Sequence, residues 1–162
     1  MPWWGSKARQ FRAHLAARVT AEERGSLAAW ARPAELALFD GMHVADRRHG
    51  LDVVGYLRRE GVTDRDVLAA GLLHDCGKGG AGVWPRVAWS LGERYGSGLR
   101  AAAAHLPGWS DQMARLRDHA ALSADAVAAA GLPPRAVALV REQDDPSDPE
   151  YGRVFHAADE AC

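Results

Sequence analysis

Apolar side chains recur every three or four positions along almost the whole chain, a spacing that predicts amphipathic α-helices. No segment of strand length alternates apolar and polar residues, no internal repeat is visible, and no linker divides the 162 residues. We therefore predict an all-α fold in which residues 1–162 form one domain, a helical bundle. Helix starts are indicated at Ser6, Thr20, Pro33, Met42, Thr63, Trp84, Leu99, Pro134 and Tyr151.

Two of the predicted helices carry the residues of greatest chemical interest. The helix over residues 42–60 holds His49 in its middle, on a rigid element suited to positioning a ligand. The next helix, which we expect Thr63 to cap, runs through an apolar stretch and delivers His74 and Asp75 at its C-terminal end.

After residue 76, glycine and serine residues indicate where loops and helix ends lie. Residues 77–82 form a glycine-rich loop, but no predicted strand precedes it, which argues against a nucleotide-binding P-loop. Ser110 and Ser123 are expected near the ends of two separate helices, the later of which stops at Gly131.

The segment His74-Asp75-Cys76-Gly77-Lys78 carries the strongest chemical signal in the sequence. Adjacent side chains on a helix point about 100° apart, but at a helix end both can converge on one cation. Histidine supplies an imidazole nitrogen and aspartate an anionic oxygen, which together suit a divalent metal. We expect Gly77 to leave the helix with positive φ and Lys78 to place its ammonium beside the metal, a charge arrangement that matches phosphate. The alternative is structural, because a histidine paired with a carboxylate at a helix end would satisfy both groups.

One dyad cannot fill a coordination shell, and His49 and Asp159 are the candidates for the remaining ligands. Each has a structural alternative, a packing histidine and an exposed acid near the chain end. The order His, His-Asp and a distant Asp resembles the HD-domain superfamily of metal-dependent phosphohydrolases, whose signature is H…HD…D on an all-helical fold. The resemblance extends to the HDxGK form of the dyad and covers about residues 33–162, so residues 1–32 are interpreted as an N-terminal helical extension. It implies the metal ligands His49, His74, Asp75 and Asp159.

The resemblance also indicates how many ions the site holds. Many members of that superfamily bind a second metal through two further histidines, and the first of these corresponds to His119. At the position of the second this chain has Gln143, and an amide oxygen is a weaker ligand than imidazole for a transition metal. We therefore expect one divalent ion, drawn from Mn²⁺, Fe²⁺, Co²⁺, Ni²⁺ and Mg²⁺.

Composition narrows the set of partners. The formal net charge is −1 and the isoelectric point about 6.6, which favours neither a nucleic-acid polymer nor an anionic membrane as a partner. The two cysteines form no disulfide framework, and the N-terminal residues lack the apolar segment of a signal peptide or an anchor. We therefore expect a cytoplasmic protein, and the sequence leaves a homodimer open.

The resemblance implies hydrolysis of a phosphomonoester or phosphodiester by a metal-activated water, with a nucleotide as the substrate we favour. Asp75 and Lys78 would be the catalytic residues, and Lys78, Arg48 and His119 would contact the substrate. The alternative is a non-catalytic HD-fold module that binds a nucleotide or a protein partner, which Gln143 favours and the intact set of four ligands disfavours.

Overall fold

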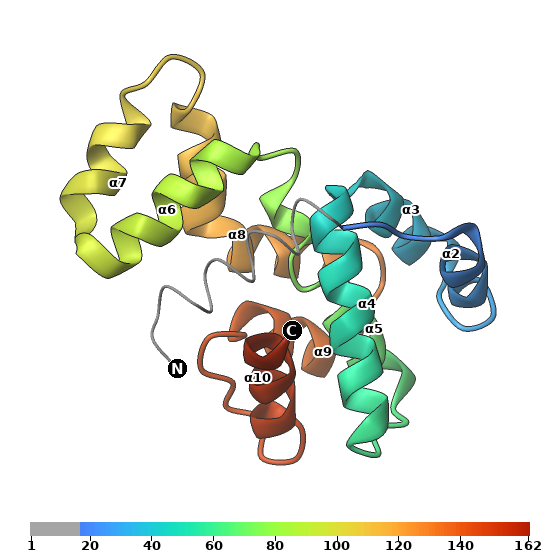
Figure 1. The fold of residues 1–162 in the computed structure, drawn as a ribbon. Coiled ribbons are helices and arrows are strands. Elements are labelled where there is room, and N and C mark those ends of the chain that lie inside the picture. Colours follow the sequence, from blue (N-terminus) through green and yellow to red (C-terminus); the bar gives the residue numbers. More distant parts are fainter. Residues whose placement is uncertain (1–16) are drawn as a thin grey trace.

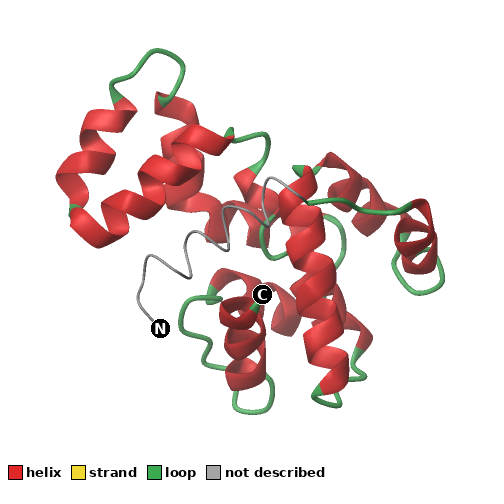
Figure 2. Cartoon of the chain, in the orientation of Figure 1, coloured by secondary structure: helices red, strands yellow, loops and turns green. Residues whose placement is uncertain are grey.

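The computed structural model describes residues 17–162, apart from the side chain of Glu93, and this part of the chain contains helices and no strand (Figure 2). The predicted all-α, single-domain fold is confirmed, while the helix expected to begin at Ser6 lies outside the described residues. The elements in chain order are α2 (Ala21–Leu27), α3 (Pro33–Gly41), α4 (Val44–Arg59), α5 (Arg65–Leu73), the 3₁₀ turn η1 (Cys76–Lys78), α6 (Val83–Tyr95), α7 (Ser97–Ala104), α8 (Ser110–Ala129), α9 (Pro134–Arg141) and α10 (Gly152–Ala161).

Helix α5 is the centre of the main hydrophobic core. All of its residues from 67 to 73 are buried, which explains why this stretch is apolar on every side and not amphipathic. Phe39 of α3 and Phe155 of α10 are fully buried in the same core. Leu27 of α2 belongs to it as well, so the predicted N-terminal extension contributes to the core. A helix packed in this way holds its C-terminal end rigidly, and that end carries His74.

Gly50 allows α4 to lie unusually close to α5. A Cβ atom at this position would lie 2.3 Å from the carbonyl oxygen of Leu72, so only glycine permits the observed separation of the two helices. His49 precedes this contact by one residue, and His74 follows it by two. The close approach therefore brings the two histidines together.

Gly77 has a different role from the one expected. Positive φ occurs at Gly79, with φ of 57°, and not at Gly77. A Cβ atom on Gly77 would lie 2.4 Å from the carbonyl oxygen of His119 and 2.6 Å from the backbone nitrogen of Ser123. The glycine is thus required for the close packing of η1 on α8, and its N–H donates to Oγ of Ser123 at 2.8 Å.

Several predicted helix boundaries differ from the structure; α4 begins at Val44 and not at Met42, and α7 at Ser97 and not at Leu99. Ser110 begins α8, but Ser123 lies buried inside this single 20-residue helix, because its hydroxyl is satisfied by η1 and not by a helix end. Helix α5 is capped by Asp64 and not by Thr63; the carboxylate accepts two backbone N–H groups of the first turn. Both residue types are good caps, so a neighbouring pair is hard to separate from the sequence.

A second, smaller apolar cluster joins α6, α7 and the N-terminal half of α8. Figure 1 shows α6 and α7 standing apart from α4, α5, α9 and α10, with α8 reaching both groups. None of the helices in residues 17–162 has both the length and the apolar character needed to cross a bilayer. The buried residues of the small cluster are Ala81, Ala103, Met113 and Leu116.

Candidate metal centre

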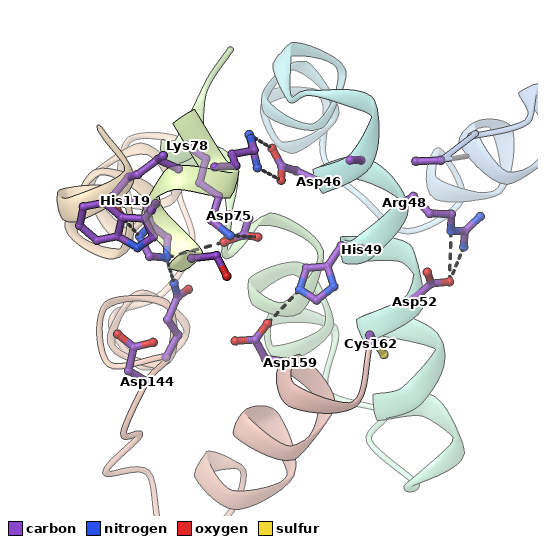
Figure 3. A pocket seen from close by; sticks show the side chains of 17 residues that line it. Asp46, Arg48, His49, Asp52, Asp75, Lys78, His119, Asp144, Asp159 and Cys162 are labelled. Carbon is purple, nitrogen blue, oxygen red and sulfur yellow. Dashed lines mark hydrogen bonds and ion pairs between the residues drawn. The ribbon is translucent and has the colours of Figure 1, made fainter. Parts of the chain in front are cut away.

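Three side chains from different parts of the chain converge on one point: His49 in the middle of α4, His74 directly after α5, and Asp159 in α10. Nε2 of His49 lies 2.9 Å from Oδ1 of Asp159, and Nε2 of His74 lies 3.1 Å from the same oxygen. Figure 3 shows the first of these contacts. One donor atom from each residue lies within 4.8 Å of the others, and ligand atoms about 2 Å from a shared ion are typically 3–4 Å apart. The group could therefore hold a metal ion.

The ring of His74 is held in the orientation that a metal ligand needs. Its Nδ1–H donates to the carbonyl oxygen of Gly71 at 2.9 Å, which turns Nε2 toward Asp159. The side chain is 1% exposed and packs edge-on against Phe155, with ring centroids 6.3 Å apart. Metal-binding histidines commonly donate their second ring N–H to a backbone carbonyl in this manner.

The electrostatics of the cluster favour a positive charge. Burial opposes protonation of His74, but the charge of Asp75 and the hydrogen bond to Asp159 outweigh it and raise the pKa of His74 to about 9. Burial also opposes ionisation of Asp159, yet the hydrogen bonds from His49 and His74 hold the pKa of Asp159 well below its usual range. The negative charge that stabilises this proton would also stabilise a metal cation in its place, so the donor set could hold a metal ion.

Asp75 and Lys78 form an ion pair beside the cluster. Nζ of Lys78 donates to Oδ2 of Asp75 at 2.6 Å, and the same oxygen lies 3.7 Å from Nε2 of His74. Burial opposes both charges, but each side chain stabilises the other, so the pKa of Asp75 is lowered and that of Lys78 is raised. Asp75, the predicted fourth ligand, does not belong to the group of three whose donor atoms lie within 4.8 Å of one another; it lies beside His74 as a carboxylate with its own ammonium partner.

His119 contacts Gln143 and not a second metal cluster. Nδ1–H of His119 donates to the carbonyl oxygen of Leu116 at 2.9 Å, and its Nε2 lies 2.8 Å from the amide nitrogen of Gln143 and 3.9 Å from Oδ1 of Asp75. Gln143 is 2% exposed. Within residues 17–162, one group of three or more histidine, cysteine and acidic ligands comes together, and His119 does not belong to it.

The cluster opens on a cavity of about 460 Å³, a size typical of small-molecule sites. The wall includes side chains from both halves of the molecule, from α4 and α10 on one side and α6 and α8 on the other. His74 lies behind this wall. The predicted site residues that line the cavity are Arg48, His49, Asp75, Lys78, His119 and Asp159.

Arg48, a predicted substrate contact, is held by two carboxylates on the cavity wall. Its Nε and Nη2 donate to Oδ1 of Asp52 at 3.1 and 2.8 Å, one helical turn along α4. Its Nη1 donates to Glu23 at the start of α2. The guanidinium is thus on the cavity wall, but its positive charge is already paired with the carboxylates of Asp52 and Glu23.

An ion pair that the sequence did not reveal connects the two sides of the cavity. Nη1 and Nη2 of Arg86 donate to the two oxygens of Asp46 at 2.6 and 2.7 Å, which links α6 to α4. Asp46 lies one turn before His49 on α4, so the helical spacing alone indicates that Asp46 and His49 share a face of this helix. No pattern in the sequence indicates that Arg86, 40 residues further along the chain, is the partner of Asp46.

No family model, no curated protein and no solved structure matches this chain. The resemblance to the HD-domain superfamily remains a prediction from the sequence motif. What the structure adds is the convergence of His49, His74 and Asp159 beside the Asp75–Lys78 pair.

Proposed function

We propose that this protein is a metal-dependent phosphohydrolase of the HD type that uses one divalent ion. The observation that carries the proposal is that two imidazole nitrogens meet one carboxylate oxygen, 2.9 and 3.1 Å away, at the wall of a cavity. A buried carboxylate–ammonium pair lies next to them. A structural ion pair would need one histidine, and the second makes a metal site the better explanation.

His49, His74 and Asp159 would hold the ion, with Asp75 as the fourth ligand. Imidazole combined with carboxylate suits Mn²⁺, Fe²⁺, Co²⁺ or Ni²⁺ and tolerates Mg²⁺. When bound, such an ion supplies Lewis acidity, because it lowers the pKa of water and withdraws charge from a phosphoryl oxygen.

Lys78 and Asp75 have complementary parts in the hydrolysis. The raised pKa keeps Lys78 protonated, so it neutralises charge on the phosphoryl oxygens as the ester bond breaks. Asp75 is a weak base because Lys78 lowers its pKa, so it orients the attacking water through a hydrogen bond. The water oxygen bonds to phosphorus as the bond between phosphorus and the ester oxygen breaks, and a proton released by that water ends on the leaving oxygen. The products are an alcohol and phosphate, or an alcohol and a phosphomonoester when the substrate is a diester.

A nucleotide is the substrate class that we favour. The cavity is large enough for a compact phosphate ester, and Trp89 and Leu116 add apolar surface to its wall. His119 lines the same cavity beside Asp75 and Gln143, and we expect it to contact the substrate.

Metal content and phosphate release, measured on the same preparations, test the proposal. Protein purified without chelator should contain about one equivalent of a divalent metal and should release phosphate from a nucleotide panel supplemented with Mn²⁺ or Co²⁺. Asp159→Asn should lose metal and turnover together, since one oxygen serves both histidines. Lys78→Ala should keep the metal but lose turnover by about 100-fold or more, as expected for removal of a charge that acts on the transition state.

The matched control is Glu160→Gln, which changes the exposed neighbour of Asp159 on α10 and should behave as the unmodified protein. Full turnover in Asp159→Asn would contradict the proposal. Metal-free protein that binds nucleotides without hydrolysing them would instead establish the non-catalytic module, the alternative that Gln143 favours.

A further inference from the structure

The cations on the cavity wall are already paired with carboxylates. Lys78 is bound to Asp75, Arg86 to both oxygens of Asp46, and Arg48 to Asp52. Among residues 17–162, these three are the lysine and arginine side chains that line the cavity, and none of them lacks a carboxylate partner. A site that binds several phosphoryl groups normally offers unmatched cations, because each phosphoryl group adds negative charge.

Carboxylates outnumber these cations. In the part of the wall formed by residues 17–162, five aspartates stand against the three cations, so one divalent ion would bring that part to formal neutrality. With the charges balanced in this way, the metal and Lys78 would attract one phosphoryl group. A second or third group would meet ionised carboxylates with no spare positive charge among the described lining residues, which costs binding free energy in a partly desolvated cavity.

Asp144 is the unpaired member of this set. Its carboxylate lines the cavity, is exposed, and has no hydrogen bond or ion pair within residues 17–162. Figure 3 shows it near His119, at the opposite side of the site from His49. A phosphoryl chain that extends from the metal centre toward this wall would approach an uncompensated negative charge.

We propose that the cavity selects substrates with a single phosphoryl group, and that Asp144 is the residue that discriminates against nucleoside di- and triphosphates. This inference rests on the proposed function for the place of the phosphoryl group, and it adds the substrate class. Selectivity arises from repulsion of the longer phosphates and not from a tighter fit of the monophosphate.

The inference can be tested with the mono-, di- and triphosphate of one nucleoside. The metal-loaded protein is assayed for binding and for hydrolysis of each of the three. Affinity from calorimetry, with metal content checked after each titration so that chelation is not counted as binding, should fall as the phosphate chain lengthens. Affinity that rises with chain length would overturn the inference. Falling affinity without any phosphate release would leave it standing and would refute the proposed hydrolysis.

Asp144→Asn provides the second test. The affinity for the diphosphate relative to the monophosphate should rise about three- to tenfold, the effect of removing one partly screened charge. The control is Asp145→Asn, which removes the same charge from an exposed neighbour that does not line the cavity and should change the ratio less than about twofold. An unchanged ratio in Asp144→Asn, or equal changes in both variants, would overturn the role of Asp144.

Discussion

The proton on His74 explains how a single oxygen of Asp159 serves two histidines. Nδ1 of His74 faces the carbonyl oxygen of Gly71, which can only accept, so it carries a hydrogen. With its pKa raised to about 9, His74 carries a hydrogen on Nε2 too and donates it to Asp159. In the metal-free protein the imidazolium therefore supplies the positive charge that a metal would bring.

This assignment predicts how the stability of the metal-free protein depends on pH. The folded-state pKa of His74, about 9, lies above the reference value of 6.5, so its contribution is complete below pH 6.5 and is lost as the pH rises through 9. The free energy of unfolding should fall by on the order of 2–3 kcal/mol across this window. Urea unfolding in the presence of a chelator at several pH values measures it.

Two variants separate His74 from other titrating groups. His74→Asn should remove most of the pH dependence, whereas His105→Asn, which changes an exposed histidine at the end of α7, should retain it. A metal-free protein whose stability stays constant from pH 6.5 to 9 would show that His74 is not protonated as proposed.

At the scale of elements, the sequence predicts the helices well because each carries its own local signals. Pro33 at a first helical position and Thr20 as a cap are examples, and Thr20 forms the complete capping box with Glu23. Two of the errors occurred where tertiary packing decides. Ser123 interrupts no helix because η1 satisfies its hydroxyl, and Gly77 is needed for contact with α8 and not for a turn.

The same distinction applies to the candidate site. His49, His74 and Asp159 could be proposed from their order in the sequence, because that order resembles a known motif. The Arg86–Asp46 pair joins residues 40 positions apart, and no local pattern predicts such a contact. The Asp144 carboxylate, which has no partner within residues 17–162, is likewise recognised only after the cavity wall is known.

The packing of α4 on α5 gives a prediction at this scale. Gly50→Ala places a Cβ atom against the backbone oxygen of Leu72, which cannot move aside, so the two helices must separate. We expect a loss of about 1–3 kcal/mol in the free energy of unfolding. Metal affinity should fall as well, because His49 moves with α4 away from His74. Urea unfolding and a metal titration measure the two effects.

Gly55→Ala on the same helix is the matched control. Its Cβ would meet only the flexible end of Arg59, at 3.5 Å, and alanine is the better helix former by about 1 kcal/mol. This variant should keep or gain stability and bind metal normally. Equal behaviour of the two variants would show that the close approach at Gly50 does not position the site.

For the whole molecule, the metal centre joins elements that are distant in sequence. His49 and Asp159 are 110 residues apart, and His74 and Asp159 are 85 apart. Helix α10 is held to the core by Phe155 and Ala158, both fully buried, and at the centre by Asp159. An ion shared by α4, α10 and the end of α5 would therefore cross-link the first and last parts of the fold that the structure describes.

Metal removal should consequently lower the stability of the whole fold. A ligand that binds only the folded state adds about 2.7 kcal/mol when its free concentration is 100 times its dissociation constant. Chelator-treated protein should unfold at a lower urea concentration than metal-loaded protein. Amide hydrogens of α10 should also exchange faster after chelation, because this helix loses its attachment through Asp159 and the ion.

The source of this stabilisation can be located with the variants already introduced. Asp159→Asn should abolish the difference between metal-loaded and chelated protein, since both histidines lose their shared partner. Glu160→Gln should preserve the difference, because its side chain lies outside the cluster on the same helix. If the unmodified protein unfolds at the same midpoint with and without metal, then no ion links α4, α5 and α10, and the three side chains serve packing alone.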